Sequence, residues 1–405
     1  MHSTAVQTSN TLNDVKYEIR GQLARRAYEM ERQGYEILSL NIGNPGLFGF
    51  RTPETMRLAM IENLGGAEPY SHQKGIFPAR EAVVMQQQDR GVHDVTADEV
   101  FIGNGVSELI DLSLRALLNV GDEVLVPSPD YPLWSAAVTL NGGVAKHYPC
   151  PPDQAFMPDV AAIESMLTPR TRAIVVINPN NPSGAVYDRE TLAQIVALAE
   201  QHDLVVLSDE IYDQMTYDGA EFFPLATMVK NTVCLTFSGL SKVYRACGYR
   251  VGWCVFSGEI DRAESYKNGM ELLASLRLCS NVPGQWAVQT ALGGFQSIND
   301  LVVPGGRLYQ SRQAVIDAVG ESRYLSVERP MGAMYAFVRL DESISTKIDD
   351  KAFALELLES KHVLVAPGSS FNTPYKDHFR ITTLPDPDVI FDVFSRIESL
   401  LEQHA

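Results

Sequence analysis

An acid and a lysine each follow a short apolar segment in the middle of the chain. Asp209 comes directly after Leu204 to Ser208, and Lys242 lies five residues beyond the end of Val233 to Phe237. In an open sheet of parallel strands, ligands bind beyond the carboxyl ends of the strands. An acid at that edge needs a cationic partner or hydrogen bonds, and a lysine among apolar strand ends can act as a nucleophile. The two residues therefore predict a site where an amine reacts beside a half-buried carboxylate.

Other groups with chemical potential are placed at the same predicted edge. The turn Gly103-Asn104-Gly105-Val106-Ser107 leads into a helix, where free backbone N–H groups favour a phosphate. Tyr131, fixed by flanking prolines, can stack on a planar ligand, and Asn181 lies in a run of turn formers with its amide free to donate. Arg250 adds a cation close to the phosphate turn. Each group alone is more often structural, as a turn, a core cap or a surface charge.

Taken together, these groups match the needs of pyridoxal 5′-phosphate. The lysine would form the Schiff base, and the acid would keep the pyridine nitrogen protonated so that the ring accepts electrons. The amide would bind the phenolate oxygen of the ring, and the glycine turn with the arginine would hold the phosphate. We therefore expect a pyridoxal-phosphate site at this edge and no metal site.

The elements that must position these groups alternate along the chain as short strands and amphipathic helices, which is typical of a parallel sheet wrapped by helices. One helix, capped by Asp188, carries Leu192, Ile195, Val196 and Ala199 at the spacing of a buried stripe. A second predicted helix covers Val106 to Asn119. The predicted strands are Val100 to Ile102, Glu123 to Pro127, Ala173 to Asn178, Leu204 to Ser208, Val233 to Phe237 and Val251 to Phe256.

The rhythm changes after Gln285, which indicates a second, smaller α+β unit. Strand-like segments flank the Pro330-Met331-Gly332 turn, and a last helix runs through Val389 to Leu401. Because the first helix, near Gln22 to Gln33, does not fit the crossover pattern, we expect both chain ends to contribute to this unit. The predicted division is residues 1–62 for an amino-terminal arm and part of the small domain, 63–300 for the large cofactor-binding domain and 301–405 for the small carboxyl-terminal domain.

Composition excludes several classes of function. Among 405 residues, Lys and Arg number 33 against 50 Asp and Glu, and the formal charge of −17 argues against nucleic acid as a partner. The aliphatic runs are too short for a membrane span, and the polar start of the chain lacks the apolar stretch of a signal peptide. The five cysteines form no CxxC pair, so we interpret them as reduced core thiols and expect a cytoplasmic location.

Four motifs stand together in a way that resembles a known family, the fold type I, class I aminotransferases that depend on pyridoxal phosphate. They are Asn41-Ile42-Gly43-Asn44-Pro45, Asn181-Pro182-Ser183-Gly184, Ser208-Asp209-Glu210-Ile211-Tyr212, and Ser241-Lys242 with Arg250. The resemblance extends to His378-Phe379-Arg380-Ile381 and so covers nearly the whole chain. It implies a homodimer that acts on amino acids and 2-oxo acids.

The resemblance also implies individual roles. Lys242 would be the Schiff-base lysine, Asp209 the partner of the pyridine nitrogen, Asn181 and Tyr212 the donors to the ring oxygen, Tyr131 the stacking ring, Val106, Ser107 and Arg250 the phosphate site, Tyr70 a phosphate contact from the neighbouring subunit, Arg380 the grip on the substrate α-carboxylate, and Gly43 and Asn181 further substrate contacts. One departure is Gly239, three residues before the lysine, where many relatives carry a phosphate-binding serine. If a hydroxyl is used here, Ser238 or Ser241 must supply it.

Within the family, the chain most resembles the bacterial glutamate–pyruvate (alanine) aminotransferases. The resemblance rests on Tyr17-Glu18-Ile19-Arg20-Gly21, the Gly43 motif, Tyr131-Pro132-Leu133-Trp134 and Pro304-Gly305-Gly306-Arg307-Leu308-Tyr309. It implies exchange of an amino group between L-alanine with 2-oxoglutarate and pyruvate with L-glutamate. We interpret Arg20 as a mobile second cation for the distal carboxylate of glutamate. The alternatives are an aminotransferase for other small or branched amino acids, a lyase on the same fold, and a binding protein without turnover.

Overall fold

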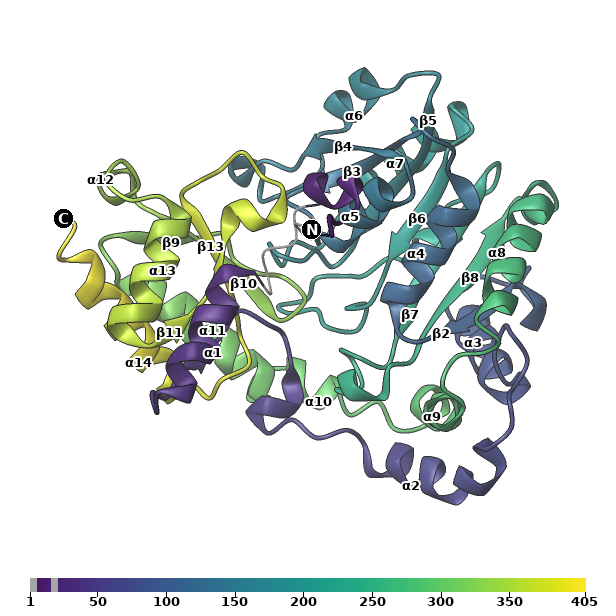
Figure 1. Cartoon of the computed structure of the whole chain (residues 1–405), viewed down its shortest axis with the longest axis horizontal. Coiled ribbons are helices and arrows are strands. Elements are labelled where there is room, and N and C mark those ends of the chain that lie inside the picture. The colour runs from purple at the N-terminus through teal and green to yellow at the C-terminus, as the bar shows by residue number, and fades with distance from the viewer. Residues whose placement is uncertain (1–5, 16–20) are drawn as a thin grey trace, which may run out of the picture.

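The large sheet of the structure holds the predicted strands in one layer. A computed structural model describes residues 6–15 and 21–405 (Figure 1). The strand order is β2-β8-β7-β6-β5-β3-β4, and every strand is parallel to its neighbours except β8, which is antiparallel to both β2 and β7. The strands are β2 (Val100–Gly103), β3 (Glu123–Ser128), β4 (Val144–Pro149), β5 (Thr171–Ile177), β6 (Val205–Asp209), β7 (Val233–Gly239) and β8 (Gly252–Gly258). The predicted fold class is confirmed, with β4 as a strand that the sequence pattern did not indicate.

Helices cover both faces of this sheet because its strands are apolar on both sides. In β5, Ala173, Val175 and Ile177 pack into one core cluster, while Ile174 and Val176 pack into another. The first cluster is closed by α4 (Val106–Leu117), α5 (Leu133–Leu140) and α8 (Glu264–Leu276). The second is closed by α3 (Phe77–Asp89), α6 (Val160–Met166), α7 (Arg189–Gln201) and α9 (Val282–Gly293), and α2 (Glu54–Glu62) packs on α9. The side chain of Asp188 caps α7 as the sequence predicts.

A second core lies around a smaller antiparallel sheet of order β12-β13-β10-β9. Its strands are β9 (Leu325–Val327), β10 (Tyr335–Leu340), β12 (Ala366–Pro367) and β13 (His378–Thr382), and its helices are α11 (Arg307–Glu321), α13 (Asp350–Lys361) and α14 (Pro387–Leu401). From the other chain end, α1 (Gln22–Arg32) packs against α13, and β1 (Leu38–Ser39) pairs with β11 (Val363–Leu364). Figure 1 shows the purple helix α1 beside the yellow-green helices of this unit. The predicted division of the chain into three segments stays a prediction.

The short helices include η1 (Asn10–Asp14), α10 (Asn299–Val302) and α12 (Glu342–Ser345). Within the part of the chain that the structure describes, we find no helix with the length and apolar character needed to cross a membrane.

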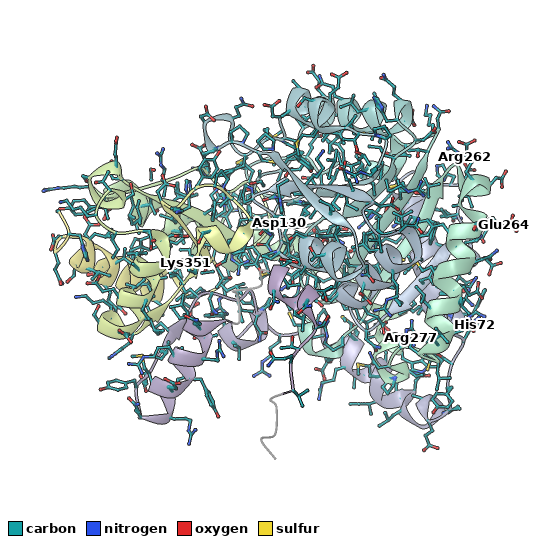
Figure 2. All side chains as sticks on the ribbon, turned by 45° about the horizontal axis from the view of Figure 1, so that its top comes forward. His72, Asp130, Arg262, Glu264, Arg277 and Lys351 are labelled. Atoms are coloured by element: carbon teal, nitrogen blue, oxygen red, sulfur yellow. The ribbon has the colours of Figure 1, made fainter. Side chains whose placement is uncertain are left out.

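Two junctions tie the small sheet to the large one. Asn372 donates to Asp130 at 2.9 Å, and the Asp130 backbone N–H donates to the Phe371 carbonyl at 2.9 Å. Figure 2 shows Asp130 near the centre of the molecule, where the yellow unit meets the rest. These contacts place the loop before β13 beside the loop after β3.

The second junction is the turn that precedes β10. The Tyr217 N–H donates to the Met331 carbonyl at 2.9 Å, and the buried guanidinium of Arg312 donates to Asp218 at 2.7 Å. Arg312 also donates to the Pro330 carbonyl and lies 4.8 Å from the centre of the Tyr217 ring. Arg329 donates to the same Asp218 carboxylate at 2.9 Å, but its side chain is 47% exposed.

We expect Arg312→Met to lower the free energy of unfolding by about 2 kcal/mol, because it leaves the buried Pro330 carbonyl without its donor. The matched variant Arg329→Met removes an exposed cation from the same carboxylate and should cost less than about 1 kcal/mol. Equilibrium urea unfolding of both variants measures the difference. Equal losses would contradict this account of the junction.

Candidate active site

A cavity of about 750 Å³ opens at the carboxyl edge of the large sheet and reaches to the small sheet. The residues that line it come from segments that follow β1, β2, β3, β5, β6 and β7 and from β10 and β13. Among the predicted site residues, it brings together Gly43, Val106, Ser107, Tyr131, Asn181, Asp209, Tyr212, Ser241, Lys242, Arg250 and Arg380. Eleven positions that are far apart in sequence therefore share one cavity.

The acid predicted from the strand pattern is fully buried at the end of β6. Asp209 accepts a hydrogen bond from the Trp134 indole at 2.9 Å and one from the Ile211 backbone at 3.4 Å. Burial raises the Asp209 pKa to about 6, although both hydrogen bonds and the positive charge of Lys242 oppose that rise. The carboxylate is therefore held ready to face a cation within the cavity.

Lys242 comes from the loop after β7, the strand next to β6. Its side chain is partly buried, and its Nζ donates to the Gly43 carbonyl at 2.7 Å. Because β6 and β7 are parallel neighbours, with Asp209 opposite Phe237, the acid and the lysine leave the sheet at the same edge. This register explains why one cavity contains both groups.

Arg250 reaches the same edge because β8 runs antiparallel to β7. Gly239 at the end of β7 lies opposite Gly252 at the start of β8, so Arg250, two residues before that start, lies beside the carboxyl ends. The Arg250 guanidinium rests against Gly105, where a Cβ would come within 2.3 Å of it. Gly105 has a φ of +82° and directly precedes α4. A cation and the free N–H groups of a helix start thus adjoin one another, as an anion requires.

The departure at Gly239 has a steric reason. A Cβ at this position would lie 2.8 Å from the Val251 carbonyl oxygen and 2.9 Å from the Gly252 Cα, so a serine would need a backbone shift. Ser241 lines the cavity, while Ser238 is buried in β7 and is not part of the lining. Of the two candidate hydroxyls, only Ser241 therefore faces the cavity.

At the opposite end of the cavity, Arg380 is held in a fixed plane. It donates to the Asn181 side chain at 2.8 Å and to the Asn41 carbonyl, and it stacks between the rings of Tyr335 and Phe371, at 4.2 and 4.6 Å from their centres. Its buried Nε has no hydrogen-bond partner among the described residues. Because Arg380 lines the cavity and its plane is fixed, its guanidinium is suited to bind a carboxylate there.

Two predicted residues lie elsewhere. Tyr70 is 78% exposed and does not line the cavity of this chain. Arg20, with its neighbours Tyr17, Glu18 and Ile19, lies outside the described residues. Neither interpretation is tested by the fold of a single chain.

Three residues of the site escaped the sequence reasoning. Trp134 supports Asp209 from α5, and its aromatic neighbour Tyr131 was the only signal for it. Tyr335 begins β10 in the small sheet, whereas the sequence pattern predicts a site only at the carboxyl ends of the large sheet. Cys247 lines the cavity and contacts the Ser241 carbonyl, so its interpretation as a core thiol is wrong. Cys150, Cys234 and Cys254 are buried, Cys279 is half-buried, and all five thiols are free.

The cavity fits pyridoxal 5′-phosphate by the chemistry of its groups. A buried carboxylate suits a protonated pyridine nitrogen, an accessible amine suits an aldehyde, and the Arg250 end suits a phosphate. Burial raises the pKa of the Tyr212 hydroxyl well above its ordinary value, so that hydroxyl keeps the proton it can donate.

The comparisons with known proteins agree with this chemistry. The family model described as aminotransferase class I and II matches residues 35–392. The chain is 47% identical to the glutamate-pyruvate aminotransferase AlaA of Escherichia coli K12 over 385 residues, which cover 95% of each chain. It is 49% identical to the alanine aminotransferase of Mycobacterium tuberculosis, covering 94% of this chain and 89% of that one.

Solved structures give the same result. A crystal structure of an Escherichia coli aminotransferase superposes with a TM-score of 0.97 at 46% identity, over 98% of this chain and 99% of that chain. The alanine aminotransferase of Pyrococcus furiosus superposes with a TM-score of 0.93 at 34% identity, over 98% and 100%.

The raised Asp209 pKa predicts a pH effect on the protein without cofactor. The pKa is about 6 in the folded chain against an ordinary value of 3.8, so folding is favoured below pH 4 and this contribution is lost as the pH rises through 6. The loss is on the order of 3 kcal/mol. The side chain of Asp209→Asn does not titrate. The unfolding free energy of the variant minus that of the natural protein should therefore increase between pH 4 and pH 6.

Urea unfolding of both cofactor-free proteins from pH 4 to pH 8 measures the effect. Burial also raises the pKa of Glu210, to about 7, but both proteins carry Glu210 and its contribution cancels. Parallel stability curves would show that Asp209 is not perturbed as described.

Proposed function

The chain belongs to the class I and II aminotransferases, and on that premise we propose that it exchanges an amino group between L-alanine with 2-oxoglutarate and pyruvate with L-glutamate. Its cofactor is pyridoxal 5′-phosphate, and its substrates are amino acids and 2-oxo acids. The observation that carries the choice of alanine is the near full-length similarity to relatives that bear this activity in their names.

We assign the chemical roles to the groups around the carboxyl edge. When bound, the cofactor withdraws electrons from the substrate Cα and so weakens the bond to its proton. Asp209, supported by Trp134, holds a proton on the cofactor's pyridine nitrogen. Lys242 holds the cofactor covalently between turnovers, and its freed Nζ moves the proton that leaves the substrate Cα. Tyr212 and Asn181 donate to the ring oxygen, and Tyr131 stacks on the ring.

The remaining assignments concern the two charged ends. Val106, Ser107, Ser241 and Arg250 bind the phosphate, and the guanidinium of Arg380 binds the substrate α-carboxylate. We assign Gly43 a substrate contact as well, and its missing side chain lets its backbone lie close to Tyr335, because a Cβ there would lie 2.2 Å from the Tyr335 hydroxyl. Fixing the carboxylate sets which Cα bond faces the cofactor.

A pocket that accepts both alanine and glutamate needs a second cation that binds only the longer substrate. We assign this role to Arg20, which lies in the sequence between η1 and α1. In the structure, η1 packs beside α5, the helix that follows the Tyr131 loop.

The test is single-turnover mixing of the cofactor-loaded enzyme with one amino acid at a time, followed by the absorbance of the bound cofactor. L-alanine and L-glutamate should both react, and Arg20→Ala should raise the KM for glutamate and 2-oxoglutarate about tenfold or more, with less than a twofold change for alanine and pyruvate. Lys242→Ala should bind the cofactor without a covalent bond and should not turn over.

The same panel separates the alternatives. Faster reaction of a branched or other small amino acid than of alanine would make the chain an aminotransferase with another preference. Release of an altered carbon skeleton without transfer of the amino group would indicate a lyase. Equal losses for both substrate pairs in Arg20→Ala would give Arg20 a structural role, and near-normal turnover of Lys242→Ala would contradict the assignment of the lysine.

We also propose that the enzyme is a homodimer in which Tyr70 reaches the phosphate of the partner. Apolar side chains are exposed on both sides of Tyr70, at Ile61, Leu64, Leu272 and Leu276. Leu272 and Leu276 are one turn apart on α8 and are 62% and 75% exposed, which is unfavourable in water.

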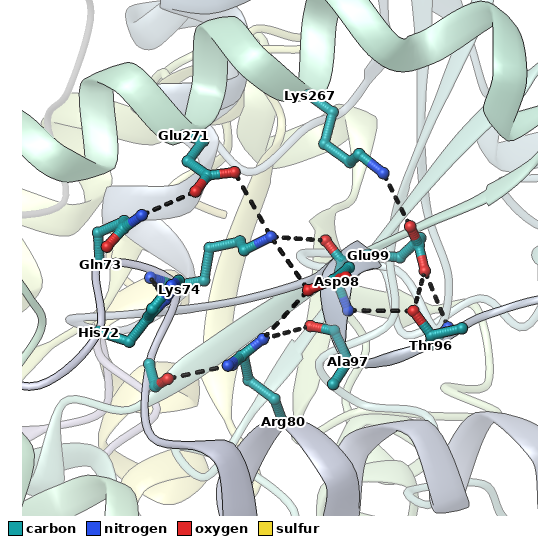
Figure 3. Close-up of polar contacts among 11 residues, drawn as sticks. His72, Gln73, Lys74, Arg80, Thr96, Ala97, Asp98, Glu99, Lys267 and Glu271 are labelled. Atoms are coloured by element: carbon teal, nitrogen blue, oxygen red, sulfur yellow. Dashed lines mark hydrogen bonds and ion pairs between the residues drawn. The ribbon is translucent and has the colours of Figure 1, made fainter.

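The segment after Tyr70 is fixed to α8 by ion pairs. Lys74 lies 3.4 Å from Glu271 and 3.5 Å from Asp98, and Gln73 donates to Glu271 at 2.7 Å. Figure 3 shows Lys74 pointing between the two acids, with Arg80 below. The network supports a rigid surface on which Tyr70 projects outward for a second copy.

Replacing Leu272 and Leu276 together by Asp should give a monomer that binds the cofactor more weakly, because each site would lose the partner's Tyr70. The control is Leu355→Asp on α13, an exposed leucine of the small unit, which should leave the dimer intact. Sedimentation velocity and cofactor titration measure the two effects. A natural protein that sediments as a monomer would contradict the proposal.

The cytoplasmic location and a role in amino-acid biosynthesis stay predictions. We keep them, together with the absence of nucleic-acid and membrane partners, as part of the proposed function.

A further inference from the structure

Tyr335 is a buried cavity residue whose position is fixed by both sheets. It is the first residue of β10, and it pairs with Thr382 of β13 in the register that also places Phe337 opposite Arg380. The preceding Ala333 donates its N–H to the Met215 carbonyl at 2.8 Å, and Thr383 donates to the Met334 carbonyl at 2.9 Å. The ring therefore enters the cavity from a backbone that is held on both sides.

The ring of Tyr335 and the ring of Phe371 enclose the Arg380 guanidinium, as described above. The Tyr335 ring also meets the Tyr212 ring nearly at right angles, with 5.9 Å between centres. Tyr335 thus touches both the arginine assigned to the substrate and the tyrosine assigned to the cofactor.

The hydroxyl of Tyr335 faces the Tyr212 hydroxyl, which donates to it at 3.2 Å. The pKa directions agree with that geometry. Burial raises the pKa of Tyr335, but the charges of Lys242 and Arg380 and the hydrogen bond from Tyr212 outweigh it and lower the net value. Tyr212 is therefore the donor and Tyr335 the acceptor of this hydrogen bond.

A hydroxyl can donate one hydrogen bond and accept others. Once Tyr212 donates to the cofactor's ring oxygen, its proton is no longer available to Tyr335. Tyr335 can then turn its own proton toward the Tyr212 oxygen, and a donor that itself accepts a hydrogen bond is a stronger donor.

We propose that Tyr335 is a positioning residue that acts through Tyr212 and Arg380: its hydroxyl strengthens and orients the Tyr212 hydroxyl, and its ring fixes the plane of the Arg380 guanidinium. The inference rests on the proposed roles of Tyr212 and Arg380. The hydroxyl and the ring of Tyr335 therefore have separate effects. One substitution can remove the hydroxyl alone, and another can remove the ring as well.

Tyr335→Phe removes only the hydroxyl. The measurement is a pH titration of the absorbance of the cofactor bound to Lys242, without substrate. A weaker Tyr212 donor stabilises the negative ring oxygen less, so the apparent pKa of the lysine–cofactor linkage should rise by about half a unit to one unit. Tyr212→Phe should raise it at least as much, and adding Tyr335→Phe to that variant should give no further rise.

Tyr335→Leu removes the ring as well. It should raise the half-saturation concentration in the single-turnover reaction about tenfold for L-alanine and L-glutamate alike, because both carry the α-carboxylate. Tyr335→Phe keeps the ring and should change it less than threefold. This pattern differs from that of Arg20→Ala, which distinguishes the two substrates.

Gly43→Ala gives an independent route if Tyr335→Phe does not fold. Its Cβ would displace the Tyr335 hydroxyl, and the φ of Gly43 does not lie in the left-handed region, so the same rise in apparent pKa is expected.

An unchanged titration in folded Tyr335→Phe, or an equal shift on the Tyr212→Phe background, would overturn the relay through Tyr212. Equal half-saturation changes for Tyr335→Phe and Tyr335→Leu would overturn the separate role of the ring. The titration uses no substrate, so its outcome does not depend on the preference for alanine. Failure of the proposed cofactor linkage would be seen separately, as near-normal turnover of Lys242→Ala.

Discussion

The buried carboxylate of Asp209 is the constraint on which the site depends. An ionised acid at the end of an apolar strand is costly, and the structure offsets that cost with one indole N–H, one backbone N–H and a nearby amine. A bound cationic ring nitrogen would complete the set. The packing of α5 on the sheet is therefore part of the chemistry, because it delivers Trp134 to the acid.

The second requirement is that two sheets meet at one cavity. Arg380 belongs to the small sheet, yet it donates to Asn181 of the large one and to the backbone of Asn41 from the amino-terminal region. The loops at Asp130 and Met331 hold the sheets together on either side. Cofactor chemistry can thus be assembled mainly on the large sheet, while recognition of a substrate carboxylate needs both.

The sequence was informative where one physical rule was sufficient. Apolar runs predicted six strands of the large sheet, and the rule for parallel strands predicted that Asp209 and Lys242 would share an edge. β4 was not indicated because Lys146 and His147 interrupt its apolar pattern at the sheet margin. Arg250 lies at the predicted edge because β8 runs antiparallel to β7. The strand pattern in the sequence does not reveal this direction. Arg380 and Gly43 came from the family resemblance, and Tyr335 came from neither, since its contacts depend on how the two sheets pack.

The glycines at 239 and 252 lie face to face, and the start of α4 rests on the second of them. A Cβ at 252 would come within 2.5 Å of the Val106 backbone nitrogen, a closer conflict than the one at 239. In evolutionary terms, the two positions are constrained together. A side chain gained at either would push β7, β8 and α4 apart before it could contribute to binding. A lineage that starts from this packing is therefore expected to vary its phosphate contacts at the exposed residues of the loops, where single substitutions remain accessible.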